Sequence, residues 1–204
     1  TNGHGTFMAG LIAGHDSDLT APYADAPESV YRGVAPDARI VNVKVGAADG
    51  SVDVSQVIAA IDWVVQHKDD NGMHIRVLNL SYGTNSLQSP SSDPLSYAAE
   101  QAWNAGIVVV VAAGNTGYQT GSGAPGLAEP AYNRTVIAVG AYDTAGTSSK
   151  SDDTVSAFSA SGQCWDGCRN PDFVAVGSHM RGLRVPNGYV DVAHPEALLG
   201  DRFF

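Results

Sequence analysis

A single run of apolar residues limits the fold of this chain more than any other feature. Residues 107–112 read IVVVVA, so five of six consecutive positions carry a β-branched side chain. A continuous run of this kind is typical of a strand that is buried on both faces, and such strands belong to parallel sheets covered by helices. The run therefore predicts an α/β fold with a parallel sheet at its centre.

Strand and helix patterns alternate along the rest of the chain. Further β-branched segments predict strands, and apolar residues that recur at helical spacing predict helices. This order is typical of an open, doubly wound, mostly parallel sheet in three layers with helices on both faces. We see no internal repeat or linker, and we expect one domain over residues 1–204 that is incomplete at both ends. The other predicted strands are 38–45, 75–83, 135–143 and 171–177, and the predicted helices are 4–14, 55–67 and 94–105.

The composition is typical of a compact globular protein, and the net charge disfavours two classes of binding partner. Of the 204 residues, 44% are hydrophobic and only 16% are charged, which argues against disorder. The formal net charge of −10 disfavours binding to phosphate backbones or anionic lipid, so nucleic acid and membrane are poor partners. No apolar run approaches the roughly 20 residues that cross a bilayer, and no signal-peptide pattern stands at the start.

Three polar, glycine-containing loops follow predicted strands. They are residues 47–53, 81–86 and 112–117. In open parallel sheets, ligands bind where loops converge at the carboxyl ends of the strands. The pattern therefore predicts a ligand-binding or catalytic site at this edge, although any α/β domain with such a function would show it.

Two residues in these regions carry side chains suited to catalysis. His4 begins a predicted helix and is followed by Gly5, so its imidazole can project into a crevice with no neighbouring side chain in the way. Asn115 ends the buried strand between Gly114 and Gly117. Taken singly, neither residue indicates a function, because a lone histidine is more often structural and a strand-end asparagine is more often part of a turn.

The segments around these two residues resemble a series of motifs in one enzyme family. HGTFMAGLIAG at 4–14 resembles the histidine box HGTxxAGxIAG of subtilisin-like serine peptidases, and GVAPDARIVNVKV resembles the segment that follows it. LNLSYG, GIVVVVAAGNTG, TVIAVGAYD and VSAFSASG are similar to later motifs, in the family's order. One short motif would be weak support, whereas this series extends over most of residues 2–177.

The resemblance implies a subtilisin-like α/β fold and a role for each matching residue. His4 matches the histidine that takes the proton of the catalytic serine and returns it to the leaving amine. Asn115 matches the asparagine whose amide donates a hydrogen bond to the oxyanion of the tetrahedral intermediate. The implied substrate is an extended or unfolded polypeptide with apolar or aromatic side chains near the cut. The residues implied to contact it are Asn2, Gly50, Ser51, Val52, Ser81, Tyr82, Gly83, Ala113 and Gly114.

Two parts of the family's catalytic triad have no match in this chain. The aspartate belongs to a D-[ST]-G motif before the histidine, and only three residues precede His4. The serine belongs to a G-T-S-M-A-x-P motif, and we reject the GTS at 146–148 because it precedes SAFSASG and no MA follows it. We therefore expect a fragment, inactive alone, of a secreted bacterial serine endopeptidase.

No cofactor is required for this chemistry, and we expect no metal site. Asp16, Asp18 and Asp25 offer oxygen ligands to calcium in the loop after the first helix, but a solvated acidic loop is the simpler explanation. Cys164 and Cys168 fit a local disulfide of a secreted protein, with two free thiols or a zinc site as the alternatives. The expected state is a monomer.

Two other functions compete with an active peptidase. A non-catalytic protein of the same fold would bind peptides along residues 81–83 and would not need the aspartate and serine motifs. A nucleotide-binding α/β domain would share the sheet pattern. However, no G-x-G-x-x-G or P-loop sequence follows the first predicted strand.

Overall fold

The structure is a computed structural model, and its backbone forms two compact units. One unit consists of Thr1–Asp53 and Arg181–Phe204, and the other of Val54–Met180. Cys164 and Cys168 lie outside the described residues, so their pairing stays a prediction, as does the single domain. The described residues are 1–27, 29–86, 88–118, 126–162 and 170–204.

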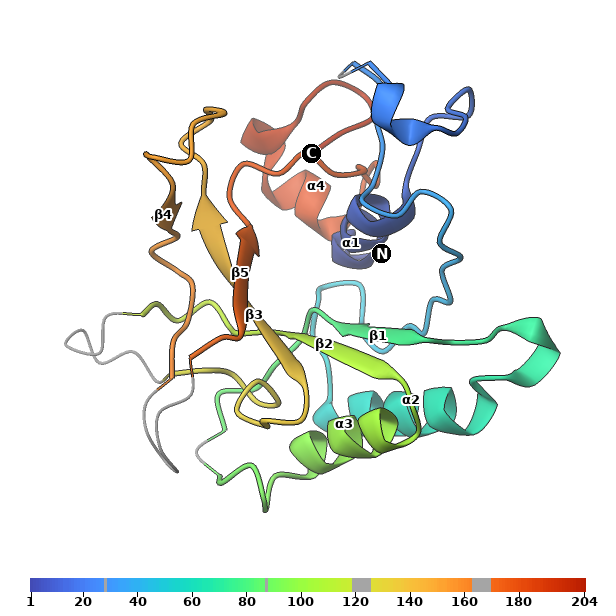
Figure 1. The fold of residues 1–204 in the computed structure, drawn as a ribbon, viewed down its shortest axis with the longest axis vertical. Helices are drawn as coiled ribbons and strands as arrows, with labels where there is room; N and C mark the ends of the chain where they lie inside the picture. The colour runs from blue at the N-terminus through green and yellow to red at the C-terminus, as the bar shows by residue number, and fades with distance from the viewer. Residues whose placement is uncertain (28, 87, 119–125, 163–169) are drawn as a thin grey trace. The chain divides into compact units, whose positions relative to one another are not determined.

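The unit Val54–Met180 contains an open sheet (Figure 1). The strands β1, β2 and β3 are parallel neighbours, and β5 is parallel to β3. The two-residue strand β4 pairs antiparallel with the end of β3. The mostly parallel α/β sheet predicted from the sequence is confirmed. The strands are β1 (Val77–Leu80), β2 (Val108–Ala112), β3 (Ile137–Asp143), β4 (Thr154–Val155) and β5 (Phe173–Val176).

Strand β2 is the apolar run that dominates the sequence. Its register pairs Val111 with Leu80 of β1 and Ala112 with Val139 of β3, so β2 lies between two parallel neighbours. Val109 and Val111 are buried. Burying a side chain of this size stabilises a fold by roughly 1.5–3 kcal/mol. The prediction that both faces of the strand are buried is wrong, because burial alternates along it and Val108 is 41% exposed.

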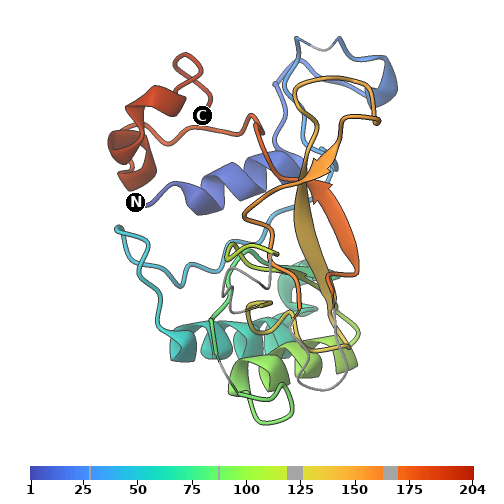
Figure 2. The same ribbon diagram turned by 90° about the vertical axis from the view of Figure 1, so that its left-hand side faces the viewer.

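Helices α2 (Val54–His67) and α3 (Pro94–Asn104) of this unit pack against each other (Figures 1 and 2). A short 3-10 helix, η2 (Asp70–Gly72), follows α2. The buried residues of the two helices recur at the predicted helical spacing. None of the helices in the described residues is long and apolar enough to cross a membrane. The buried apolar residues are Val57, Ile61 and Val64 on α2, and Leu95, Ala98, Ala99 and Ala102 on α3.

The ends of α3 are set by local sequence. The carboxylate of Asp93 accepts a hydrogen bond from the N–H of Ser96 at 2.9 Å, which satisfies one of the unpaired donors of the first turn. Pro94 occupies the first helical position, where its missing N–H costs nothing. Gly106 follows the helix with a φ of 84°, so the predicted left-handed glycine at this end is confirmed.

The unit formed by Thr1–Asp53 and Arg181–Phe204 contains the helix predicted at the start of the chain. Gly10 is buried inside this helix, and a Cβ there would lie 2.8 Å from Leu183 Cγ and 2.9 Å from Tyr31 Oη. The glycine is therefore tolerated because neighbouring side chains pack directly on the helix backbone. The helices of this unit are α1 (His4–Ala13), η1 (Tyr23–Asp25), α4 (Tyr189–Ala193) and η4 (Pro195–Ala197).

The prediction of a strand over 38–45 is wrong. This segment has no regular secondary structure, and Ile40 and Val41 are 47% and 40% exposed. Strand propensity reflects packing against adjacent strands more than a preference of the backbone itself. The described residues of this unit contain no strand that offers the segment an edge.

Candidate active site

The imidazole predicted to act as acid–base catalyst lies at the start of a helix. His4 is the first residue of α1 and is exposed. Its backbone N–H donates to Asn2 Oδ1 at 3.2 Å, and the N–H of Phe7 donates to the carbonyl of Gly3 at 3.0 Å. A Cβ on Gly5 would meet no atom within 4 Å, so the space beside this residue is open.

Gly50 and Ser51, two of the predicted substrate contacts, belong to one turn of the same unit, and Val52 directly follows this turn. The N–H of Ala47 donates to the carbonyl of Ser51 at 2.9 Å and closes this turn. Gly50 has a φ of 91°, a left-handed conformation that favours glycine. A Cβ at Gly50 would lie 2.8 Å from Asn2 Nδ2. The structure therefore brings Asn2 next to this turn.

In the other unit, two groups of predicted residues come to one edge of the sheet. Ser81–Gly83 directly follow β1, and Ala113–Asn115 directly follow β2. Because β1 and β2 are parallel neighbours, both groups lie at the carboxyl end of the sheet. Ala113 continues the sheet, since its N–H donates to the carbonyl of Val139 at 2.8 Å.

A third segment, residues 128–129, joins these two groups, and sequence analysis missed it. The N–H of Ala128 donates to the carbonyl of Ala113 at 2.8 Å. Thr84 and Glu129 exchange two backbone hydrogen bonds, of 3.0 and 2.8 Å. The segment therefore connects the loop after β1 with the loop after β2. Its only signal in the sequence is a Glu-Pro pair inside an apolar stretch, and such a pair does not by itself indicate a site.

Two glycines allow these loops to approach so closely. A Cβ on Gly83 would lie 2.7 Å from Ala128 Cβ and 3.0 Å from the carbonyl oxygen of Glu129. Gly114 has a φ of 111°, and a Cβ there would lie 3.1 Å from Ala128 Cβ. Larger residues at either position would push the loops apart.

Asn115 is exposed on a loop whose backbone is held on both sides. The N–H of Gly117 donates to the carbonyl of Phe158 at 2.9 Å, and the carbonyl of Gly114 accepts from the N–H of Ala160 at 3.1 Å. A hydrogen-bond donor that is held in place before the reaction needs no reorganisation when negative charge develops. The loop therefore suits the predicted role of Asn115.

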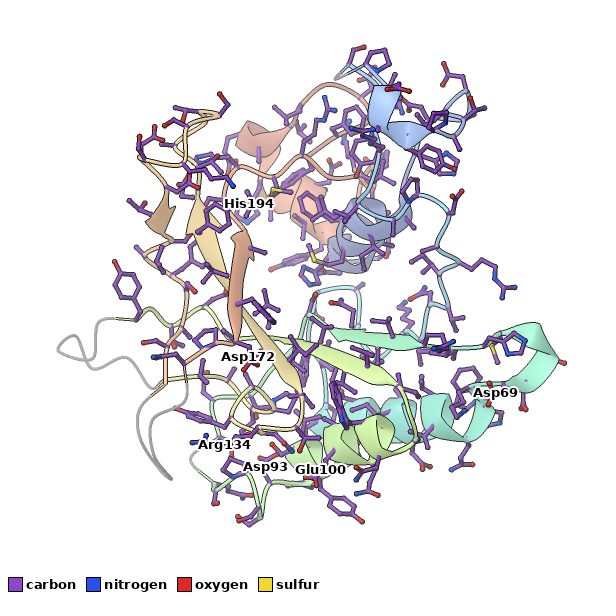
Figure 3. All side chains as sticks on the ribbon, viewed as in Figure 1. Asp69, Asp93, Glu100, Arg134, Asp172 and His194 are labelled. Atoms are coloured by element: carbon purple, nitrogen blue, oxygen red, sulfur yellow. The ribbon has the colours of Figure 1, made fainter. Side chains whose placement is uncertain are left out.

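Glu129 carries a buried carboxyl group in the segment that joins the loops. Its side chain is 0% exposed, and its Oε2 accepts a hydrogen bond from Ser96 Oγ at 2.6 Å. Within the described part of the chain, Oε1 has no partner. Burial raises the pKa of Glu129 to about 7, and the charge of Asp93 adds to the rise. The hydrogen bond from Ser96 acts in the opposite direction and lowers the pKa. Figure 3 shows Asp93 at the start of α3 and Glu100 further along that helix.

Replacing Glu129 by Gln is expected to change how stability depends on pH. The folded protein favours the neutral carboxyl, because the pKa of Glu129 is raised from 4.5 to about 7. The wild type therefore keeps this stability below pH 4.5 and loses up to about 3 kcal/mol as the pH rises through 7. The Glu129→Gln variant has no carboxyl to titrate at this position. Its free energy of unfolding should therefore rise relative to that of the wild type over the same pH range.

Urea unfolding of the full-length protein at several pH values measures this difference. A His4→Ala background, in both the wild type and the variant, prevents self-digestion during the experiment. The comparison below pH 4.5 is the internal control, because the carboxyl is then neutral in the folded and the unfolded chain. A stability difference that stays constant up to about pH 8 would contradict the argument from burial.

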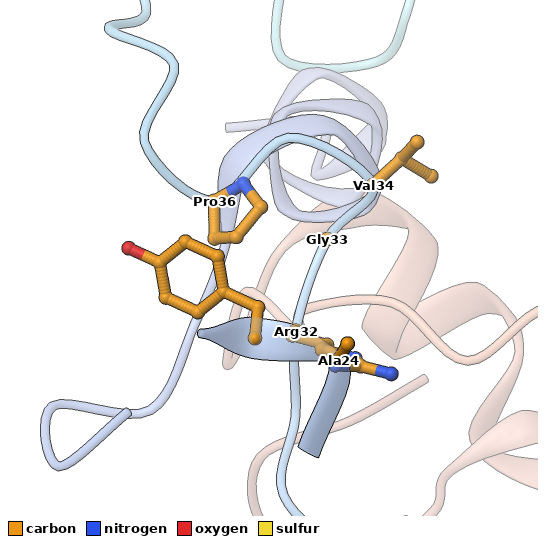
Figure 4. Close-up of a pocket in the computed structure, with 6 residues that line it drawn as sticks. Ala24, Arg32, Gly33, Val34 and Pro36 are labelled. Carbon is orange, nitrogen blue, oxygen red and sulfur yellow. The ribbon is translucent and has the colours of Figure 1, made fainter. Parts of the chain in front are cut away.

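A pocket of about 410 Å³ in the unit that contains α1 holds none of the predicted site residues (Figure 4). Figure 4 shows Val34 turned away from Pro36, and Val34 is 94% exposed. Arg32 is the one charged residue of the lining. This lining does not support a catalytic role. It consists of Tyr23, Ala24, Arg32, Gly33, Val34 and Pro36.

In the acidic loop after α1, one carboxylate forms hydrogen bonds within the protein. Asp16 accepts hydrogen bonds from the guanidinium of Arg202 and, at 3.0 Å, from the N–H of Tyr31. The bond from Arg202 is the main reason that the pKa of Asp16 is lowered. Among the residues that the structure describes, no three His, Cys, Asp or Glu side chains are grouped as a metal ion would need. The expectation that this loop binds no structural calcium ion stays a prediction.

The two predicted catalytic residues belong to different units. His4 and Asn2 lie in the unit of α1, whereas Asn115 lies with Ser81–Gly83 in the unit of the sheet. Within each unit, the structure brings together the predicted site residues that belong to that unit. The convergence of His4 and Asn115 on one crevice stays a prediction.

Two known proteins similar to this chain are proteases by name. The chain is 37% identical over 206 residues to serine protease AprX of Bacillus subtilis (strain 168), a match that covers 100% of this chain and 44% of that protein. It is 38% identical over 142 residues to subtilisin Savinase of Lederbergia lenta, covering 70% of this chain and 43% of that protein. The chain therefore spans less than half the length of these curated relatives.

The fold and the family model agree with these relatives. The structure of Sphericase matches with a TM-score of 0.69 at 27% identity, over 92% of this chain and 56% of that one. A model of the subtilase family, peptidase family S8, matches residues 1–197. Because that match extends over nearly the whole sequence, the chain belongs to the subtilase family.

Proposed function

We propose that this chain is part of a serine endopeptidase that hydrolyses peptide bonds by a Ser-His-Asp mechanism. Its family, and relatives named serine protease and subtilisin, support the proposal. The observation that carries it is the sheet edge where Ser81–Gly83 meet Ala113–Asn115, with Asn115 exposed on a loop held by backbone hydrogen bonds. An exposed amide donor beside a strand end suits both an oxyanion and an extended substrate.

In this mechanism His4 is the general acid–base catalyst. Its imidazole takes the proton of the serine hydroxyl as the oxygen attacks the substrate carbonyl, and then gives that proton to the leaving amine. The carboxamide of Asn115 donates a hydrogen bond to the carbonyl oxygen as it becomes negative. The serine and the aspartate are proposed to come from other parts of a longer polypeptide, since AprX is more than twice as long as its matched region. The 204 residues alone are therefore expected to be inactive.

The proposed substrate is a protein segment in extended conformation. Its backbone would add as a strand beside Ser81–Gly83, and residues 50–52 with Asn2 would provide further contacts. Apolar or aromatic side chains near the cut are proposed from the family resemblance. The proposed enzyme is a secreted, bacterial monomer that needs no cofactor for the chemistry, and its bacterial relatives named subtilisin or alkaline protease support that origin.

Labelling with a fluorophosphonate probe tests this function. The probe reacts with a serine that its triad has activated, so the full-length protein is expected to be labelled at one serine. A full-length His4→Ala variant is the matched control and should remain essentially unlabelled. A full-length protein that folds but is not labelled would refute the proposal. Such a result would favour a non-catalytic peptide-binding protein of the same fold.

A further inference from the structure

The segment Arg181–Phe204 packs around the backbone that leads into α1 (Figures 1 and 2). The N–H groups of Tyr189 and Val190, the first residues of α4, donate to the carbonyls of Thr1 and Asn2 at 2.9 and 3.0 Å. Donors in the first turn of a helix have no partner inside that helix. Helix α4 therefore uses these donors to hold the backbone immediately before α1.

The fit between α4 and this backbone is close. A Cβ on Gly188 would lie 3.3 Å from the carbonyl oxygens of both Thr1 and Asn2. The Cβ position of Gly3 lies 3.8 Å from Val190 Cβ, which is an ordinary packing contact. The backbone of the first three residues is thus held by hydrogen bonds and by contact on the side that faces α4.

The same segment also covers one face of α1. A Cβ on Gly182 would collide with the ring of Phe7. The Cβ position of Gly10 lies 2.8 Å from Leu183 Cγ. Phe7 and Gly10 are three residues apart and so lie on one face of the helix. The segment therefore fixes both the helix and the backbone before it.

Asp191 holds α4 in this arrangement. Its buried carboxylate accepts hydrogen bonds from Arg184 Nε at 2.5 Å and Arg184 Nη2 at 3.0 Å, and from the N–H of Asn187 at 2.8 Å. The hydrogen bonds from Arg184 lower the pKa of Asp191, so the pair remains charged at neutral pH. A two-pronged pair of this kind fixes orientation as well as distance. Because Asp191 directly follows Val190, its pair with Arg184 also fixes the N–H groups at the start of α4 that hold residues 1–2.

We propose that Asp191 is a positioning residue for His4. Without its carboxylate, α4 loses its link to Arg184, and the backbone before His4 loses its support. The imidazole then leaves the position from which it can take the serine proton. This inference rests on the proposed function, in which His4 is the general base. A displacement of about 1 Å at a catalytic group can cost about a hundredfold in rate.

Kinetics of the full-length Asp191→Asn variant test this proposal. Fluorophosphonate labelling that is run to completion counts the active sites, and kcat for a chromogenic peptide is then expressed per labelled site. Unfolded molecules lower only the count, whereas a displaced His4 lowers the rate at every site. We expect kcat per site to fall about 10–100-fold while KM stays within about twofold of the wild type.

The matched control is Glu196→Gln in the same segment. It removes a carboxylate that is exposed and pairs with His194 at 3.0 Å. Exposed pairs of this kind contribute little, so kcat per site should stay within about twofold of the wild type. If Asp191→Asn folds and gives the same kcat per site as this control, the positioning role is overturned and the peptidase function stands.

A second variant covers the case in which Asp191→Asn does not fold. Gly188→Ala adds a methyl group against the carbonyls of Thr1 and Asn2, and also against that of Val185 at 3.0 Å. It leaves the side chains of the pair between Asp191 and Arg184 unchanged. The proposal requires a lower kcat per site here too, and an unchanged value would overturn it. A wild type that is not labelled at all would refute the proposed function and this inference together.

Discussion

Replacing His4 by Ala in the full-length protein is expected to lower kcat by about six orders of magnitude. This factor is the one established for the triad of subtilisin itself, and it is carried over to His4. Without the imidazole, no group takes the serine proton as the hydroxyl attacks, and no group returns it to the leaving amine. Substrate binding and the oxyanion donors remain, so KM should change much less than kcat.

The hydrolysis rate of a chromogenic peptide measures this loss, and His15→Ala is the matched control. His15 is an exposed histidine of the same unit, and its Nδ1 lies 2.9 Å from the carbonyl oxygen of the neighbouring Asp16. Substitutions at such surface positions change free energies by about 0.5 kcal/mol or less, so this variant should keep its activity. A His4→Ala protein that retained a tenth of the wild-type kcat would show that another group is the base.

The central sheet and its helices were predictable because their signals are local. Strand β2 contains four valines in succession, and the buried residues of α2 recur at a helical spacing. Each pattern is complete within one element, so the type of that element follows from its composition. The α/β class and the main strands and helices of the sheet unit could therefore be inferred without knowledge of any tertiary contact.

The failures share a dependence on partners that are distant in the sequence. Segment 38–45 has strand composition but no strand beside it in its unit, so it stays irregular. Strand β4 and helix α4 are too short to show a period, and both are held by contacts with distant residues. Periodicity cannot report such contacts, because it describes only which side of an element is apolar.

The candidate site was predictable where a motif resemblance reached and not beyond it. His4 and Asn115 each matched a motif of the family, whereas neither residue would have indicated a function by its type alone. The buried carboxyl of Glu129 and the support of α4 by Asp191 depend on contacts with Ser96 and Arg184, and no motif described them. Residues that hold others in place are defined by tertiary contacts, so a local sequence pattern does not reveal them.

Replacing Asn115 by Leu is expected to lower kcat by about 10²–10³-fold. This magnitude was established on the corresponding asparagine of a subtilisin, and it is carried over to Asn115. Leucine has nearly the same size but no N–H, so the substitution removes the donor and leaves the loop filled. The backbone bonds of Gly114 and Gly117 do not involve the side chain of Asn115 and should persist.

The ratio of the kinetic constants decides whether Asn115 acts in the transition state. An oxyanion donor binds the carbonyl oxygen mainly when it is negative, so kcat and kcat/KM should fall by the same factor. Asn104→Leu, at the exposed last residue of α3, is the matched control and should leave both constants unchanged. If Asn115→Leu raised KM and left kcat intact, Asn115 would contact the substrate equally in the ground state. The oxyanion role would then be refuted, although Asn115 would remain part of the binding surface.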